Sequence, residues 1–273
     1  MDCTAHSSDI HTAEIVEGNI LLVTLRRPKA LNSIPASYHA RFTALWKAFE
    51  ADQNLVAAIL TGEGKLFSAG ADLKEWKDTV SMGKKVPIDM EGGFLGISNR
   101  SSKKPIIAAI NGAAYGGGTE AIVNCDLAVI ASKATLALPE VRRGVTAIAG
   151  ALPRIGREFG LKRANELALL GEPISAQKAL EWGLVNQIVP EPKDVVPAAI
   201  EYAHKLALGS PEAVSGSLIS VRRGIEDTKL TTSEAAIQGA QYELRQVAEM
   251  DNVKEGLDSF VQKRDPKWKP SKL

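Results

Sequence analysis

Two glutamates and a run of three glycines are the residues in this chain whose types and spacing could do chemistry. Gly116, Gly117 and Gly118 separate a short apolar run from a segment with helical spacing, and Glu120 lies in the first turn of that segment. Glycines at such a junction let the backbone approach a ligand closely, and a helix start leaves N–H groups without intrahelical partners. The stretch therefore offers hydrogen-bond donors for a developing negative charge, beside a carboxylate that can transfer a proton.

A purely structural role explains the same stretch on its own. The glycines could serve only close strand–helix packing, with Glu120 interacting favourably with the helix dipole. The run is neither a dinucleotide fingerprint nor a phosphate loop, because the G-x-G-x-x-G spacing and a Gly-Lys-Ser/Thr ending are both absent. The second glutamate, Glu140, follows a predicted strand, where functional sites of parallel sheets form but where turn residues and caps are also common.

The elements that position these residues are apolar strands that alternate with amphipathic helices along the chain. This alternation indicates the α/β class. Strands are predicted at 20–25, 56–60, 105–110, 126–132, 135–138 and 184–189, and helices at 35–52, from 73, 119–125, 161–170 and 175–182. Four further helices are predicted near 193–208, 211–226, 232–250 and 252–264. No strand accompanies these last four, so their apolar faces should pack on the main domain, on another subunit, or on both.

Residues 56–72 and 106–120 share one pattern: an apolar strand, turn glycines, a loop of small residues and a helix. Such a repeat suggests neighbouring parallel strands joined by right-handed crossovers. The equivalent ends of the two strands would then lie side by side. We therefore expect a backbone N–H near Ala71 and one near Gly117 to point at a single atom.

Composition narrows the possible functions. The chain has 273 residues, 45% of them hydrophobic, and a net charge of +1, which gives no general attraction to nucleic acid. Cys3 and Cys125 do not form a disulfide framework. The histidines are scattered without metal-ligand spacing, and no run of apolar residues is long enough for a membrane span. A metal-dependent mechanism therefore has little support.

The two ends of the chain and one internal segment suggest further roles. Residues 1–13 should be flexible, and they resemble neither a secretory signal nor a mitochondrial presequence. The last three residues, Ser271, Lys272 and Leu273, form the peroxisomal address S-K-L, which a polar tail should leave exposed; coincidence is the alternative. Residues 77–100 are irregular and could be a functional lid or simply disordered.

Five segments together resemble the enoyl-CoA hydratase/isomerase (crotonase) superfamily, and they cover the chain from about Ile20 to Trp268 in the expected order. These are RPKALNS (27–33), FSAGADLKEW (67–76), PIIAAINGAAYGGGTEAIVNCD (105–126), LPEVRRG (138–144) and EGLDSFVQKRDPKW (255–268). The resemblance implies a spiral of ββα repeats over residues 14–205 with a helical trimerisation region at 206–268, and leaves 269–273 as a tail. Trimers of this family often pair into hexamers.

The resemblance also assigns residue roles. It implies a CoA thioester substrate and neither a metal nor a redox cofactor. The thioester oxygen would be bound by the backbone N–H groups of Ala71 and Gly117, and Glu120 and Glu140 would be the catalytic carboxylates. Positions matching CoA contacts are Lys29, Ala30, Leu31, Ala69, Asp72, Leu73 and Lys74, and those matching contacts to a neighbouring subunit's adenine end are Phe260 and Lys263.

Hydration of a 2-enoyl thioester suits two carboxylates, since water must be activated toward Cβ and a proton delivered to Cα. We assign the proton delivery to Glu140 and the water to Glu120. The run 145–152, Arg142, Arg143, Tyr115 and Thr119 depart from the usual hydratase pattern. A branched or hydroxylated acyl group is therefore expected, in β-oxidation or in siderophore or toxin synthesis within the peroxisome, where similar fungal members work.

Two alternatives remain. A Δ3,Δ2-enoyl-CoA isomerase needs only one carboxylate, so the presence of both glutamates argues against it. A non-catalytic CoA-binding or RNA-binding member would need neither glutamate, and the chain has no basic stripe for RNA.

Overall fold

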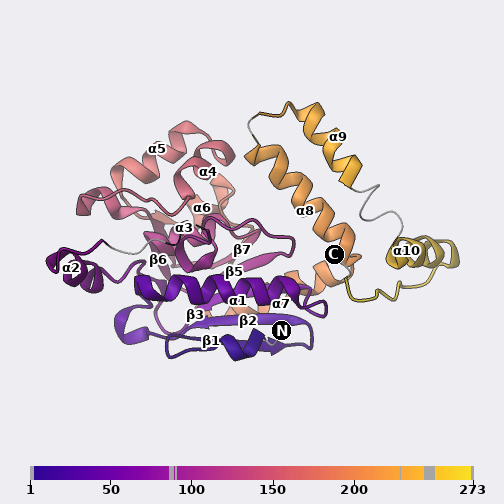
Figure 1. Cartoon of the computed structure of the whole chain (residues 1–273), viewed down its shortest axis with the longest axis horizontal. Coiled ribbons are helices and arrows are strands. Elements are labelled where there is room, and N and C mark those ends of the chain that lie inside the picture. The colour runs from indigo at the N-terminus through magenta and orange to yellow at the C-terminus, as the bar shows by residue number, and fades with distance from the viewer. Residues whose placement is uncertain (1–2, 86–88, 90, 228, 243–249, 272–273) are drawn as a thin grey trace.

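The computed structural model describes residues 3–85, 89, 91–227, 229–242 and 250–271, which form two β-sheets with helices packed around them (Figure 1). The larger sheet has the strand order β1-β2-β3-β5-β7-β10. Its strands are β1 (His11–Val16), β2 (Ile20–Leu25), β3 (Ala57–Gly62), β5 (Ile106–Ile110), β7 (Leu127–Ala131) and β10 (Gln187–Val189). Only β1 runs antiparallel to its neighbour; the other pairs are parallel.

The smaller sheet has the order β4-β6-β8-β9, with bounds β4 (Leu66–Ser68), β6 (Ala113–Tyr115), β8 (Thr135–Ala137) and β9 (Ile174–Ser175). Three successive chain segments each place one strand in the larger sheet and the next in the smaller one. A helical segment then follows each pair: α2 (Leu73–Ser81), α3 (Gly117–Val123) and the 3-10 helix η5 (Pro139–Arg143). This is the ββα repeat that the resemblance implies, and the mixed α/β class is confirmed.

The core explains why these segments fold together. Strand β3 and strand β5 are buried at every position, and α7 (Val195–Ala207) packs against both of them and against β7. Helix α1 (His39–Ala51) buries Phe42, Leu45 and Trp46, so its aromatic stripe belongs to the core, as its helical spacing indicates. Between β5 and β6 the chain crosses from one sheet to the other at Gly112, where a Cβ would lie 2.0 Å from the Lys65 carbonyl oxygen.

The remaining helices follow the repeats along the chain. They are α4 (Ala151–Glu158), α5 (Leu161–Leu170), α6 (Ala176–Trp182), α8 (Pro211–Glu226), α9 (Thr232–Tyr242) and α10 (Asp251–Gln262). Figure 1 shows α8, α9 and α10 set off to one side of the sheets. No helix among the described residues is both long enough and apolar enough to cross a membrane.

The expectation that residues 1–13 are flexible is wrong for the part that the structure describes. Residues Cys3–His6 form a 3-10 helix, and His11 pairs with Leu25 at the end of the first strand ladder. Cys3 and His11 are fully buried. This segment is polar, so its composition does not predict the strand β1, which forms because it pairs with β2.

The tail also differs from its expected exposed state. Asn252 on α10 donates to the Lys269 carbonyl (3.0 Å) and accepts from the Lys269 N–H (2.8 Å), and Trp268 donates its indole N–H to Leu208 (2.9 Å). Ser271 is consequently buried, whereas Lys272 and Leu273 lie outside the described residues. Residues 243–249 of the helix expected at 232–250 also lie outside them.

Candidate active site

Three loops meet at one edge of the smaller sheet, because β4, β6 and β8 are parallel neighbours and end together. The loop after β4 carries Ala69 to Asp72, the loop after β6 carries Gly116 and Gly117, and the segment after β8 carries Glu140. The sequence pattern correctly predicts that equivalent strand ends lie side by side. The three loops surround a cavity of about 240 Å³.

Gly70 allows the first two loops to touch. Its φ of +88° is a conformation that favours glycine, and a Cβ there would lie 2.7 Å from the Tyr115 carbonyl oxygen and 3.2 Å from the Gly117 nitrogen. The loop is held by Ile34, whose N–H donates to Gly70 (2.9 Å) and whose carbonyl accepts from Asp72 (3.0 Å). The N–H of Ala71, between them, has no hydrogen-bond partner within the described part of the chain.

Gly117 begins α3, and its N–H likewise has no partner among the residues that the structure describes. Gly116, with φ of +55°, donates to the Ala137 carbonyl (3.0 Å) and so fixes the direction of the helix start. A Cβ on Gly117 would lie 2.3 Å from the Phe94 ring, so glycine is required for this packing. Ala71 and Gly117 both line the cavity, where two unpaired donors can bind one oxygen atom.

Glu120 lies one turn into α3 and is only 3% exposed. Its Oε2 accepts a hydrogen bond from the N–H of Ala151 at the start of α4 (3.3 Å). Burial raises the pKa of Glu120 to about 7, and the Glu140 charge adds to the increase while the N–H groups of 149–151 oppose it. At neutral pH this carboxyl group therefore holds a proton part of the time.

Glu140, in η5, faces the same cavity. Its Oε1 approaches the backbone of Gly116, where a Cβ would lie 3.0 Å away. Its Oε2 is buried and has no hydrogen-bond partner among the described residues. Burial raises the pKa of this carboxyl group as well. Two partly desolvated carboxyl groups thus share one space, which suits an acid and a base in the same reaction.

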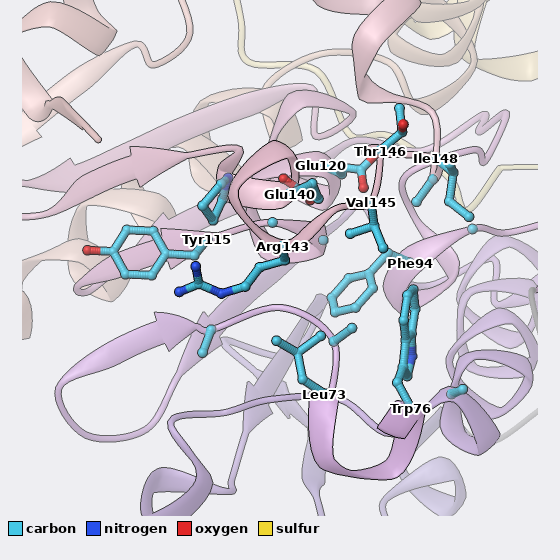
Figure 2. A pocket seen from close by; sticks show the side chains of 18 of the residues that line it. Leu73, Trp76, Phe94, Tyr115, Glu120, Glu140, Arg143, Val145, Thr146 and Ile148 are labelled. Atoms are coloured by element: carbon cyan, nitrogen blue, oxygen red, sulfur yellow. The ribbon is translucent and has the colours of Figure 1, made fainter. Parts of the chain in front are cut away.

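The rest of the cavity wall is mostly apolar, as Figure 2 shows, with side chains from α2, the segment around 94 and residues 145–149. Tyr115 and Arg143 lie on one side of the view and Trp76 on the other, with the two glutamates between. Part of the run 145–152, where the sequence departs from the usual pattern, lines the cavity through Val145, Thr146, Ile148 and Ala149. Part of the irregular segment 77–100 also contributes, through Asp89, Gly93 and Phe94.

Sequence reasoning missed three contributors, namely His39, Trp76 and Phe94. His39 was one of four scattered histidines, Trp76 marked only a helix start, and Phe94 lay in a segment without periodicity. None of them has a local signal, because the tertiary fold alone brings them to the cavity. The clash between Phe94 and any Cβ at Gly117 is visible only in three dimensions.

The predicted CoA contacts fall into four groups. Ala69 and Leu73 line the cavity. Lys29, Ala30 and Leu31 lie in and after the short helix η2 (Pro28–Ala30), and Leu31 accepts the Ala69 N–H (2.9 Å), which joins this loop to the site.

Asp72 caps α2 and pairs with Arg27 (3.1 Å), and Lys74 is exposed beside it. Phe260, which is 84% exposed, and Lys263 lie at the end of α10 and do not line the cavity. Contacts of these residues with CoA stay predictions.

Comparison with known proteins identifies the class. Residues 16–271 match the family model described as Enoyl-CoA hydratase/isomerase, and the chain belongs to this family. It is an enzyme of the hydratase class acting on a CoA thioester. The sequence is 43% identical over 282 residues, covering 100% of both chains, to a protein of Beauveria bassiana named mevalonyl-coenzyme A hydratase SIDH.

A second similar protein, of Aspergillus fumigatus, also bears the name mevalonyl-coenzyme A hydratase and is 41% identical, covering 93% of each chain. Among solved structures, an enoyl-CoA hydratase of Mycobacterium tuberculosis superimposes with a TM-score of 0.86 at 32% identity, over 97% of this chain and 100% of that one. The fold of the whole described chain is therefore that of a hydratase of this family.

Proposed function

We propose that this enzyme interconverts a 3-hydroxyacyl-CoA and the corresponding 2-enoyl-CoA, with a short acyl group that is methyl-branched and hydroxylated. The observation that carries this proposal is that one cavity is lined by the buried Glu120, the partly buried Glu140 and two backbone N–H groups without partners among the described residues. The acyl group is inferred from the two fungal relatives, whose names specify mevalonyl-CoA, a thioester with a methyl and a hydroxyl at C3 and a hydroxyl at C5.

The N–H groups of Ala71 and Gly117 would hold the thioester oxygen. Hydration and dehydration both pass through a species with negative charge on that oxygen, and preorganised donors stabilise the charge without rearranging. The donors are already free to act, because neither has a partner in the described part of the chain. Gly70 makes the arrangement possible by letting the two loops approach each other.

The two glutamates would divide the proton transfers. In hydration, the oxygen of water bonds to Cβ while its proton passes to the Glu120 carboxylate, and protonated Glu140 delivers a proton to Cα. Glu140 suits the Cα role because its Oε1 lies against Gly116, next to the donor at Gly117 that would bind the adjacent carbonyl oxygen. Proton exchange through water restores the starting state, and dehydration reverses each step.

The raised pKa of Glu120 suits proton exchange near neutral pH. A carboxyl group with a pKa near 7 exchanges protons with little driving force in either direction, which is the favourable condition for general acid–base catalysis. Arginine does not neutralise the pair directly, because no ion pair involving either glutamate occurs among the described residues.

A panel of four acyl-CoA substrates tests the reaction and the acyl preference together. The purified enzyme is offered 5-hydroxy-3-methyl-2-pentenoyl-CoA, 3-methyl-2-pentenoyl-CoA, crotonyl-CoA and a 3-enoyl-CoA, and the conjugated thioester absorbance is followed. We expect hydration with the largest kcat/KM for the hydroxylated substrate, by roughly 10-fold or more over its deoxy analogue. A larger kcat/KM for crotonyl-CoA would contradict the proposed branched, hydroxylated acyl group. Isomerisation of the 3-enoyl-CoA without hydration of any substrate would contradict the proposed hydratase reaction.

We also propose that the enzyme works in peroxisomes, through the terminal S-K-L. Deletion of 271–273 should move a fluorescently labelled protein from peroxisomes to the cytosol and leave the activity of the purified enzyme unchanged. Continued import of the truncated chain, in cells that lack a full-length copy, would contradict this address.

A further inference from the structure

We propose that Trp76 and His39 form a hydroxyl-binding subsite in the acyl cavity, in which the indole N–H and the imidazole Nε2–H both donate to a hydroxyl group on the acyl chain. This inference rests on the proposed function, since it assigns residues to the recognition of the hydroxylated substrate. Both residues line the cavity that holds Glu120 and Glu140.

Trp76 supplies a donor that the fold leaves without a partner. Its Nε1 is buried and forms no hydrogen bond with any described residue. A buried N–H group of this kind destabilises the fold unless something pairs with it. In Figure 2 the ring stands at the opposite side of the view from Tyr115 and Arg143, beyond the two glutamates.

His39 supplies a second donor from α1. The Leu95 N–H donates to its Nδ1 (3.3 Å), so the ring proton of the neutral imidazole lies on Nε2. Burial lowers the pKa of His39 to about 4, against a smaller opposing effect of Asp89, and the ring is therefore neutral at physiological pH. Among the described residues, the hydrogen bond from Leu95 to Nδ1 is the one that the His39 ring forms, which leaves Nε2 available to a ligand.

Two other polar groups of this region, the Asp89 carboxylate and the Ala36 N–H, already have hydrogen-bond partners. The Asp89 carboxylate accepts from the Thr43 hydroxyl (2.5 Å) and from the N–H groups of Glu91 (3.0 Å) and Gly92 (3.1 Å). The N–H of Ala36 donates to Glu75 (2.5 Å).

Around them the wall is apolar, with Leu73, Phe94, Val145 and Ile148. A hydroxyl oxygen has two lone pairs, so it can accept from both Trp76 and His39. An unsubstituted acyl chain would leave both donors unpaired in the complex, and the free energy of binding would favour the hydroxylated chain.

The test compares two substrates that differ by one oxygen, 5-hydroxy-3-methyl-2-pentenoyl-CoA and 3-methyl-2-pentenoyl-CoA. Trp76→Phe keeps an aromatic ring and removes the N–H. His39→Asn keeps an acceptor near the Nδ1 position for Leu95 and has no donor at the Nε2 position. We expect each variant to lose roughly 10- to 100-fold in kcat/KM for the hydroxylated substrate, and to change little with the deoxy analogue.

Trp46→Phe is the matched control. The Trp46 indole N–H donates to the Leu95 carbonyl (2.7 Å) in the core, and Trp46 does not line the cavity. This variant should lower the melting temperature while leaving the ratio of the two kcat/KM values as in the wild type.

Equal losses with both substrates in Trp76→Phe and His39→Asn would overturn the subsite. Since the wild type would still hydrate its substrates in that case, this outcome differs from failure of the proposed function, in which the wild type hydrates neither.

Discussion

Burial of the Glu120 carboxyl group couples catalysis to stability at the scale of single residues. Its pKa is raised from 4.5 to about 7 in the folded state, so the folded protein binds this proton more tightly than the unfolded chain does. The resulting contribution to stability is complete below pH 4.5 and is lost as the pH rises through 7. Above pH 7, where Glu120 is ionised and can act as a base, the folded state is therefore less stable by an amount on the order of 1–3 kcal/mol.

Replacing Glu120 by glutamine should remove this pH dependence. We expect the melting temperature of Glu120→Gln, relative to wild type, to be higher at pH 8 than at pH 5, with reduced activity at both. Glu63→Gln, which alters an exposed carboxylate paired with Arg26, is the control and should show no such change. A difference in melting temperature that stays constant between the two pH values would show that the Glu120 carboxyl group is not perturbed.

Gly117 tests the tight packing beside the proposed oxyanion donors. A methyl group there would lie 2.3 Å from the Phe94 ring, so Gly117→Ala must shift that ring or the start of α3, both of which line the cavity. We expect a loss of about 10²-fold in kcat/KM, because small misplacements at a reacting centre have effects of that size. Gly156→Ala, with open space around its Cβ, is the control for an alanine in a helix.

A smaller side chain at position 94 should relieve the clash with the methyl group of Gly117→Ala. Phe94→Leu combined with Gly117→Ala should recover part of the activity lost by the alanine alone, because the two changes act on one contact. Independent effects in the double variant would place the damage elsewhere than at this contact.

At the scale of elements, one arginine joins the C-terminal helices to the sheet. Arg222 on α8 pairs with Asp126 (2.7 Å) and donates to the Asn124 carbonyl (3.0 Å), and the paired side chains are only 14% and 8% exposed. Arg222→Met would leave a buried carboxylate unpaired, which typically reduces the free energy of unfolding by about 3–5 kcal/mol. Urea denaturation measures this change.

Arg26→Met is the matched control, since it breaks an exposed pair with Glu63 and should change the free energy of unfolding by less than about 1 kcal/mol. If both variants lose the same amount, the Arg222–Asp126 pair does not hold α8 on the sheet.

The strongly periodic or fully apolar elements could be predicted from sequence. The strand at 20–25 and the helix at 211–226 have the expected bounds, and the strand predicted at 105–110 begins one residue later and ends as expected. The three-residue strands β4 and β6 could not be found, because their glycine-rich surroundings read as loops. Strands β4 and β6 hold the loops of the site next to each other. The sequence pattern therefore predicts that these loops are neighbours, but it does not predict the smaller sheet that makes them so.

The candidate site was predicted unevenly for the same reason. Glu120, Gly117 and Ala71 stand at the ends of recognisable strand–glycine–helix units, and the structure brings them to one cavity with Glu140. His39 comes from a helix whose buried face reads as ordinary core. Its position near the acyl site depends on how α1 packs on the segment around Leu95, which no local pattern specifies.

At the scale of the whole molecule, α10 presents an apolar surface formed by Leu257, Phe260 and Val261, which are 65%, 84% and 78% exposed. Spacing of three and four residues places them on one face of the helix. Exposed apolar faces of this kind commonly form protein interfaces, and we expect this one to help hold a trimer together.

Phe260→Asp with Val261→Asp should therefore shift the molar mass measured by light scattering toward that of the monomer. Lys254→Ser, on the same helix but at an exposed polar position, is the control and should leave the mass unchanged. A trimer that survives both aspartates would show that other surfaces carry the assembly.

Single-turnover and steady-state kinetics of Glu120→Gln, Glu140→Gln and the double variant test most directly whether two carboxylates in one cavity hydrate a 2-enoyl thioester. Both glutamines preserve the side-chain shape, and binding of a CoA thioester should be retained. We predict that each single variant lowers kcat for hydration by roughly 10²–10⁴-fold, and that the double variant loses less than the product of the two. Hydration at close to the wild-type rate by either single variant would contradict the account.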